Sequence, residues 1–176
     1  MSEKISVMIS EEEIKERLTV LGREISEKYR GKEIHMICVL KGGVYFLTEL
    51  SKHIDKDVPV TLDFMSVSSY GNETKSSGVV KIVKDLDQPL EGKDVLVVED
   101  IIDSGRTLSY LLEILESRKP ASLSLCTLLD KPSRREKEVK VDYVGFEIED
   151  KFVVGYGLDY QQRYRNLPYV GVVELG

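Results

Sequence analysis

The sequence is that of a mid-sized acidic chain. Its 176 residues, 41% hydrophobic and 32% charged, suffice for one sizeable core and disfavour a second full domain. The 25 basic and 31 acidic residues give a net charge of −6, which disfavours nonspecific nucleic-acid binding through a broadly basic surface. No stretch approaches the ~18 uninterrupted apolar residues of a membrane span, and no apolar signal segment opens the chain. We therefore expect a single cytoplasmic domain over residues 1–176.

The first part of the chain alternates helical and strand patterns. Ser10 and Glu13 form a capping box, and apolar residues at helical spacing then predict an amphipathic helix that stops at Gly31. The apolar run Ile34 to Leu40 predicts a short strand, and Val44 to Ile54 a second helix. The turn between them is Lys41-Gly42-Gly43.

The histidines and cysteines do not indicate a metal site. Cys38 and Cys126 both lie in apolar runs, which indicates buried thiols in a reducing compartment instead of a disulfide. His35 and His53 have no partner at metal or triad spacing, so we interpret both as structural residues.

Two β-rich runs, Val58 to Val67 and Val79 to Val83, predict a hairpin. Between them lies Ser68 to Gly78, a polar segment rich in serine and glycine. A long loop of this kind is either unstructured filler or a mobile lid over a site, and composition alone does not separate the two.

Residues 94–115 form the stretch around which the chain is organised. The apolar run Val95 to Val98 predicts a strand buried on both faces, and after an acidic turn a helix is expected from Arg106 or Thr107. The loop between them joins the carboxyl end of a strand to the amino end of a helix, where open α/β sheets bind anions. We therefore expect a phosphate at this loop, with hydroxyl donors from Ser104 and Thr107.

Three carboxylates stand beside this loop: Glu99, Asp100 and Asp103. The spacings of the triphosphate loop and of the dinucleotide fingerprint are absent. Carboxylates repel phosphate, so they need another task, such as holding sugar hydroxyls or magnesium, or accepting a proton. The combination predicts a ligand that contains both ribose and phosphate. The alternative is that the acids only cap the helix and solvate the strand end.

The last third begins with another buried strand, Leu123 to Leu129, which ends at a charged turn containing Lys131. The charged run Ser133 to Lys140 is interpreted as a solvated face. Further short strands are expected over Tyr143 to Ile148, Phe152 to Val154 and Val170 to Glu174. The alternation of strands and helices predicts an α/β fold with a mainly parallel sheet, helices on both faces and a small C-terminal cap beside the ligand edge.

These motifs resemble those of a known family. Val97 to Thr107 resembles the phosphoribosyl-diphosphate signature of the type I phosphoribosyltransferases. Other matching segments are Leu40 to Gly43, Ser69 to Gly71, Asp130 to Pro132, Val144 to Ile148 and Lys151 to Tyr160. The signature indicates the superfamily, whereas the later segments point to its 6-oxopurine branch.

The resemblance implies the type I phosphoribosyltransferase fold, with a small hood contributed mainly by residues 131–176 together with the N-terminus. It implies a purine salvage enzyme that moves the phosphoribosyl group from 5-phosphoribosyl 1-diphosphate to hypoxanthine or guanine, which yields IMP or GMP and diphosphate. It also implies Mg²⁺ as cofactor and a homodimer or homotetramer, without nucleic-acid or membrane partners.

The resemblance assigns a role to each matching residue. Asp103 matches the general base, and the Leu40-Lys41 peptide matches one that is often cis in the family. The residues that match phosphate- and ribose-binding positions are Glu99, Asp100, Ser104, Gly105, Arg106 and Thr107, and those that match diphosphate-binding positions are Lys41, Gly42 and Arg165. The purine-binding positions are matched by Lys131, Phe152, Val153 and Asp159, and the magnesium-binding positions by Asp159, Glu99 and Asp100. Ser69 and Tyr70 match the lid. Arg135 matches a residue that assists at Lys41.

Two other functions stay open on the sequence. Some proteins with this fold are nucleotide-sensing regulators, but this chain keeps Asp103 and the purine-site residues and has no added DNA-binding segment. A transferase that prefers xanthine would differ only in its substrate.

Overall fold

The computed structural model describes residues 3–69 and 79–174. Its elements in chain order are β1 (Lys4–Ile9), α1 (Glu11–Lys28), β2 (Ile34–Val39), α2 (Val44–Lys52), β3 (Val60–Ser69), β4 (Val80–Lys84), β5 (Asp94–Ile102), α3 (Arg106–Glu116), β6 (Ser122–Asp130), a 3₁₀ turn (Pro132–Arg134), β7 (Tyr143–Glu147), β8 (Val153–Val154) and β9 (Val170–Glu174).

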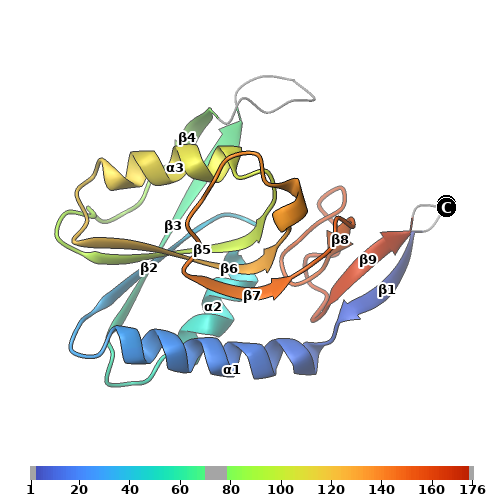
Figure 1. The fold of residues 1–176 in the computed structure, drawn as a ribbon, viewed down its shortest axis with the longest axis horizontal. Helices are drawn as coiled ribbons and strands as arrows, with labels where there is room; N and C mark the ends of the chain where they lie inside the picture. The colour runs from blue at the N-terminus through green and yellow to red at the C-terminus, as the bar shows by residue number, and fades with distance from the viewer. Residues whose placement is uncertain (1–2, 70–78, 175–176) are drawn as a thin grey trace.

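Six strands form the main sheet, in the order β4-β3-β2-β5-β6-β7. Every neighbouring pair is parallel except β3 and β4, which form the predicted antiparallel hairpin. In Figure 1, α3 covers one face of this sheet while α1 and α2 cover the other. The expected α/β fold, mainly parallel with helices on both faces, is therefore confirmed.

The helices follow from local signals in the sequence. Ser10 Oγ accepts a hydrogen bond from the Glu13 amide at 3.1 Å, and Glu13 Oε1 accepts one from the Ser10 amide at 3.3 Å, so the predicted capping box starts α1. Its buried face is Ile14, Leu18, Leu21 and Ile25. The helix ends shortly before Gly31, whose φ of +79° suits glycine.

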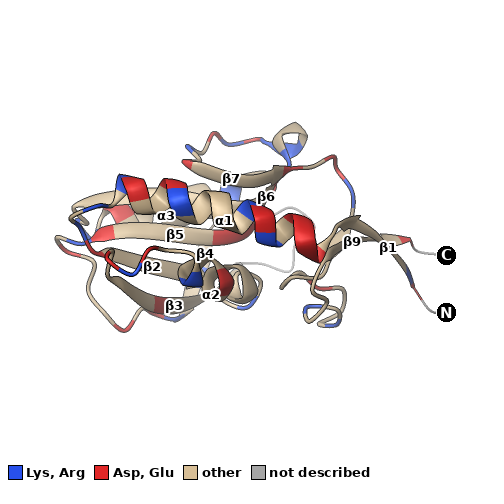
Figure 2. Cartoon of the chain, turned by 90° about the horizontal axis from the view of Figure 1, so that it is seen from below, with Lys and Arg blue, Asp and Glu red and all other residues tan. Residues whose placement is uncertain are grey.

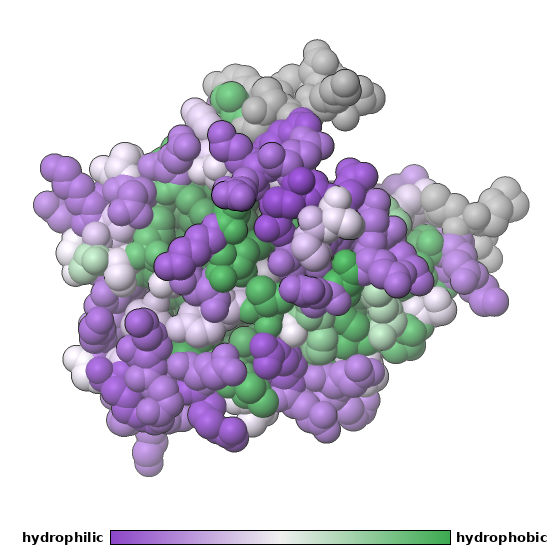
Figure 3. Space-filling view, viewed as in Figure 1, coloured by the Kyte–Doolittle hydropathy of each residue, from purple (hydrophilic) through white to green (hydrophobic). Residues whose placement is uncertain are grey.

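Two buried apolar clusters lie on opposite faces of the main sheet. Side chains of α1 and α2 pack with even-numbered residues of β2, such as Met36, and the α3 leucines pack with Ile37. The face of the molecule in Figure 3 is mostly hydrophilic, with patches of hydrophobic side chains across its middle. Both cysteines are buried and free, as predicted.

A second, three-stranded sheet joins the two ends of the chain in the order β1-β9-β8. Strand β1 was not predicted, and it is held by antiparallel pairing with β9 from Lys4↔Glu174 to Ile9↔Val170. The assignment of Tyr143 to Ile148 to the cap was wrong, because β7 pairs with β6 and forms an edge of the main sheet. Figure 1 shows the small sheet beside the end of the large one; we call this sheet, together with residues 155–169 that connect β8 to β9, the hood.

The central strand is longer than predicted. Glu99 and Asp100 lie within β5, not in a turn after it, because pairing with β6 continues to Ile102↔Asp130. The helix begins at Arg106, one of the two residues expected. The acidic pair is therefore held by the sheet itself, which fixes its backbone more firmly than a turn would.

The histidine His35 is buried, with 2% of its surface exposed. Its Nδ1 lies 2.7 Å from Thr61 Oγ1, and its Nε2 lies 3.8 Å from Asp63 Oδ2. Burial lowers the pKa of this imidazole, and nearby Lys93 lowers it further, so the ring is neutral at physiological pH. These contacts agree with the structural interpretation of this residue.

Candidate active site

The carboxyl ends of β2, β5 and β6 meet at one edge of the sheet, because these strands are adjacent and parallel. Lys41 follows β2, Asp103 follows β5 and Lys131 follows β6. Figure 2 shows acidic residues at this end of β5, on the side of the sheet nearest the hood strands β1 and β9. The topology thus brings together residues that lie far apart in the sequence.

The expected phosphate loop, residues 103–107, turns from β5 into α3. Gly105 caps the helix with φ of +84°, a conformation that glycine adopts without strain. Ser104 Oγ accepts a hydrogen bond from the Arg106 amide at 3.3 Å. A cavity of about 200 Å³ lies at the loop, and Ser104, Gly105 and Thr107 all line it. The amino end of α3 faces this space with its positive dipole, which favours an anion.

The charged run Ser133 to Lys140 is mostly exposed, as interpreted from the sequence, but its backbone also contacts the phosphate loop. The Ser104 carbonyl accepts hydrogen bonds from the amides of Glu136 at 2.9 Å and Lys137 at 3.0 Å. The Glu136 carboxylate also forms an ion pair with Arg106. This run therefore packs on the phosphate loop and fixes its shape.

Glu99 and Asp100 form a half-buried pair of neighbouring carboxylates at the end of β5. Burial raises the pKa of Glu99 well above its usual range, and the charge of Asp100 raises it further. Burial also raises the pKa of Asp100, opposed by the amides of Ile101 and Asp100 and by the charge of Arg165. The pair therefore favours partners that supply hydrogen bonds or positive charge.

The Lys41 turn is held between the sheet and the hood. The Leu40-Lys41 peptide is cis, and Lys41 Nζ donates to Gln162 Oε1 at 3.3 Å. A Cβ added at Gly42 would collide with the Asp100 carboxylate, and one added at Gly157 would collide with the Gly42 carbonyl. Only glycine fits at these two positions, because a neighbouring group lies too close to leave room for a Cβ.

Two further hood residues face this turn. Arg165 Nη2 lies 3.5 Å from Asp159 Oδ1, and Asp159 Oδ2 accepts a hydrogen bond from the Gln162 amide at 2.8 Å. Arg165 Nη1 donates to the Gly157 carbonyl at 2.7 Å. The structure thus brings the predicted residues Asp159 and Arg165 to the Lys41 turn.

The other predicted purine residues, Lys131, Phe152 and Val153, follow β6 or lie near β8. Lys131 is 8% exposed, and its Nζ lies 3.4 Å from Asp150 Oδ1. Phe152 is 51% exposed, which is unusual for so large an apolar ring, and Tyr160 packs edge-on against it at 5.7 Å between centroids. Val153 is buried in β8. Asp150, the partner of Lys131, lies two residues before Phe152, so a buried lysine and an exposed ring are both available to bind a flat, polar heterocycle.

Asp103 lies between these two halves. Its Oδ1 accepts a hydrogen bond from Arg134 Nε at 3.0 Å, and its backbone carbonyl accepts one from Arg135 Nε at 3.2 Å. Arg135 also pairs with Asp130. Arg135 thus braces the phosphate loop, whereas Lys41, which we expected it to assist, bonds to Gln162.

Several site residues were missed or are not described. Arg134, Asp150 and Gln162 carry no recognisable motif, and only the closure of the fold places them beside Asp103, Lys131 and Lys41 respectively. Of the expected lid, Ser69 ends β3 and its side chain is not described. The other lid residue, Tyr70, and the rest of the loop to residue 78 lie outside the described residues.

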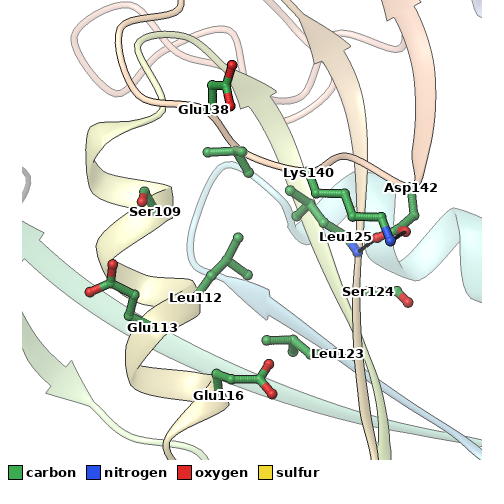
Figure 4. A pocket seen from close by; sticks show the side chains of 11 residues that line it. Ser109, Leu112, Glu113, Glu116, Leu123, Ser124, Leu125, Glu138, Lys140 and Asp142 are labelled. Carbon is green, nitrogen blue, oxygen red and sulfur yellow. Dashed lines mark hydrogen bonds and ion pairs between the residues drawn. The ribbon is translucent and has the colours of Figure 1, made fainter.

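A second hollow does not suit the same ligand. Figure 4 shows it between α3 and residues 138–142, with the side chains of Glu113, Glu116, Glu138 and Asp142 around it. The one lysine among its lining residues, Lys140, has its Nζ 3.7 Å from Asp142 Oδ1. Four carboxylates repel a phosphorylated ligand, so the edge of the sheet is the candidate active site.

The carboxylates at the edge suit a hard cation that arrives with a ligand. Within residues 3–69 and 79–174, no three histidine, cysteine or acidic side chains are grouped so that they could hold a metal ion. Magnesium, however, keeps several waters and often binds through one or two carboxylates plus substrate phosphates. Glu99, Asp100 and Asp159 supply such oxygens, so the donor set fits this ion.

Comparisons with known proteins agree on one family. The family model described as “Phosphoribosyl transferase domain” matches residues 10–161. A curated protein of Bacillus subtilis, hypoxanthine-guanine phosphoribosyltransferase, is 56% identical over 96% of this chain and 92% of its own length. A “Bifunctional protein TilS/HprT” of Listeria monocytogenes is 55% identical over 96% of this chain, which spans 26% of that longer protein.

The solved structures give the same result. A crystal structure of a hypoxanthine-guanine phosphoribosyltransferase from Bacillus anthracis superposes with a TM-score of 0.93 at 47% identity, and covers 98% of this chain and 100% of its own. No helix in the described part of the chain is long and apolar enough to cross a membrane.

Proposed function

The chain belongs to the phosphoribosyltransferase family, and on that premise we propose that its edge site transfers the phosphoribosyl group of 5-phosphoribosyl 1-diphosphate to hypoxanthine or guanine. The products are IMP or GMP and diphosphate, as in purine salvage. The observation that carries the proposal is that a phosphate loop, a half-buried carboxylate pair and a buried lysine share one sheet edge, with the exposed Phe152 ring two residues after Asp150, the partner of that lysine.

The phosphoribosyl half of the substrate binds at the carboxyl end of β5. The 5′-phosphate sits in the loop Ser104 to Thr107, where the amino end of α3 and the loop amides hold it. Glu99 and Asp100 hold the ribose hydroxyls by accepting hydrogen bonds from them, which compensates the partial burial that raises the pKa of Glu99. Their negative charge stabilises the oxocarbenium-like carbon of the transition state.

The diphosphate lies between the Lys41 turn and the hood. Lys41, Gly42 and Arg165 bind it, and the contacts of Gly157 and Gln162 keep these two segments together. Magnesium, when bound, neutralises charge on the leaving diphosphate. Glu99 and Asp100 would hold this ion on the ribose side, and Asp159 on the hood side.

The purine binds over Phe152, and Lys131 donates a hydrogen bond to its six-position oxo group. The backbone at Val153 reads the edge of the base, and Asp159 borders this pocket. A ring nitrogen then attacks the anomeric carbon, the bond to diphosphate breaks with inversion, and the proton leaves the ring for Asp103. This carboxylate follows β5 directly, between the phosphate loop and the purine pocket.

We also propose that residues 1–176 act as one phosphoribosyltransferase domain, with β1, β8, β9 and residues 155–169 forming its hood. The two buried free thiols, Cys38 and Cys126, support the cytoplasmic setting expected from the sequence, because disulfides are rare there.

One assay tests the proposed reaction. Initial rates of diphosphate release are measured with 5-phosphoribosyl 1-diphosphate, Mg²⁺ and each of hypoxanthine, guanine, xanthine and adenine. The proposal expects turnover with hypoxanthine or guanine and little with adenine, whose amino group offers no acceptor to Lys131. A preference for xanthine would change the substrate, and no turnover with any base would overturn the proposal.

A further inference from the structure

We propose that Arg134 is a positioning residue that connects the catalytic carboxylate to the purine-binding lysine. The inference rests on the proposed function, since it takes Asp103 as the proton acceptor and Lys131 as the residue that reads the purine. It concerns a side chain for which the sequence predicted no role.

Four alternating charges form a continuous chain across the site. Arg134 Nε donates to Asp103 Oδ1 at 3.0 Å, and Arg134 Nη1 lies 3.5 Å from Asp150 Oδ2. The other oxygen of Asp150, Oδ1, lies 3.4 Å from Lys131 Nζ. The guanidinium of Arg134 and the carboxylate of Asp150 thus link the two functional residues.

The backbone holds the members of this chain at short range. Arg134 ends the 3₁₀ turn that directly follows Lys131, and its amide donates to the Lys131 carbonyl at 3.1 Å. The Lys131 amide in turn donates to the Ile102 carbonyl at 3.0 Å, next to Asp103. Little flexible backbone therefore separates the purine-binding lysine from the catalytic carboxylate, and the side chain of Arg134 completes the connection.

The geometry leaves one oxygen of Asp103 for the substrate. Arg134 binds Oδ1, so Oδ2 can face the substrate while the hydrogen bond restricts the rotation of the carboxylate. A guanidinium can contact two carboxylates at once because its donors form a rigid fork, whereas a lysine ammonium is a single point of charge. Arg135 has a different task, since it binds the backbone carbonyl of Asp103 and the side chain of Asp130.

The side chain of Arg134 is exposed, so its proposed positioning role can be tested by mutation. The side chains of Arg134 and Asp103 are 52% and 48% exposed, so replacing the arginine leaves the core unchanged. Arg118 provides a matched control, because it binds Asp85 through two contacts of 2.7 and 2.9 Å at a place distant from the site.

The test compares kcat and KM of Arg134→Met, Arg134→Lys and Arg118→Met in the full chain with Mg²⁺. For Arg134→Met we expect a fall of roughly 5- to 20-fold in kcat/KM for hypoxanthine, with KM for phosphoribosyl diphosphate changed by less than about twofold. Arg134→Lys should recover part of the loss, and Arg118→Met should resemble the parent.

A double-mutant cycle separates positioning from a general structural effect. In an Asp103→Asn background, measured at raised enzyme concentration, Arg134→Met should cost less than about twofold, because the residue it positions is already disabled. An undiminished loss in that background, or equal behaviour of Arg134→Met and Arg118→Met in an active protein, would overturn the inference. A parent that transfers to no 6-oxopurine would instead overturn the proposed function, and this inference with it.

Discussion

Replacing Gly105 by alanine tests the phosphate loop most sharply. Gly105 has φ of +84°, and an added Cβ would lie 2.5 Å from the Lys137 carbonyl, 3.1 Å from Arg135 Cδ and 3.2 Å from Val139 Cγ2. Real Cβ atoms essentially never come closer than 3.0 Å to such a neighbour, so backbone must shift by at least about 0.5 Å. Because the neighbouring segment fixes the loop that holds the 5′-phosphate, that shift displaces the substrate.

The control is Gly92→Ala. Gly92 also has positive φ, +74°, but an added Cβ would meet nothing within 4 Å. Both variants carry the strain of a left-handed alanine, about 1 kcal/mol, whereas only Gly105→Ala also displaces the loop. Since a misplacement of about 1 Å can cost ~100-fold, we expect Gly105→Ala to lose roughly 10-fold or more in kcat/KM for phosphoribosyl diphosphate.

Steady-state kinetics at saturating hypoxanthine and thermal unfolding measure the two effects separately. Gly92→Ala should show a lowered Tm with kcat/KM close to that of the parent, and Gly105→Ala a lowered Tm together with the kinetic loss. Equal kcat/KM for the two variants would refute the assignment of this loop to the 5′-phosphate.

Three further predictions concern single side chains. Burial raises the pKa of Cys38 to about 12 and raises that of Cys126 as well, so iodoacetamide should modify neither thiol until urea unfolds the chain. Burial lowers the pKa of His35 in the folded chain below its value in the unfolded chain, about 6.5. The free energy of unfolding therefore keeps its full value above about pH 6.5. It decreases as the pH drops from there toward the lowered pKa of the folded chain. Urea midpoints at about pH 7.5 and about pH 6 should therefore differ less in His35→Gln than in the parent or in His53→Gln. In Lys131→Ala, discrimination between hypoxanthine and adenine should fall about 10-fold or more, and equal losses for both bases would contradict the purine contact.

Local patterns predicted those parts of the fold whose stabilising contacts are close in sequence. The Ser10 capping box and the apolar spacing of α1 act within a few residues, and the parallel order of the strands then places Lys41, Asp103 and Lys131 at one edge. The sequence thus indicated the position of the site, and the family resemblance supplied the roles of its residues.

The errors concern residues whose neighbours are distant in sequence. Strand β1 forms because Lys4 pairs with Glu174, which no local pattern indicates. The contacts of the exposed run containing Arg134 were missed because charge alone does not show which acidic residues the fold brings near it. Glu99 belongs to β5 because its partner Thr127 extends the ladder, although acidic residues have low strand propensity.

The measurement that tests the account most directly is the pH dependence of Asp103→Asn. Asparagine keeps the shape of the side chain and a carbonyl acceptor but cannot take the proton from the purine. We expect kcat to fall ~100- to ~10,000-fold, substrate binding to change less, and the acidic limb of the kcat/KM profile to disappear. A variant with kcat within a few-fold of the parent and the same acidic limb would contradict the role of Asp103 as the general base.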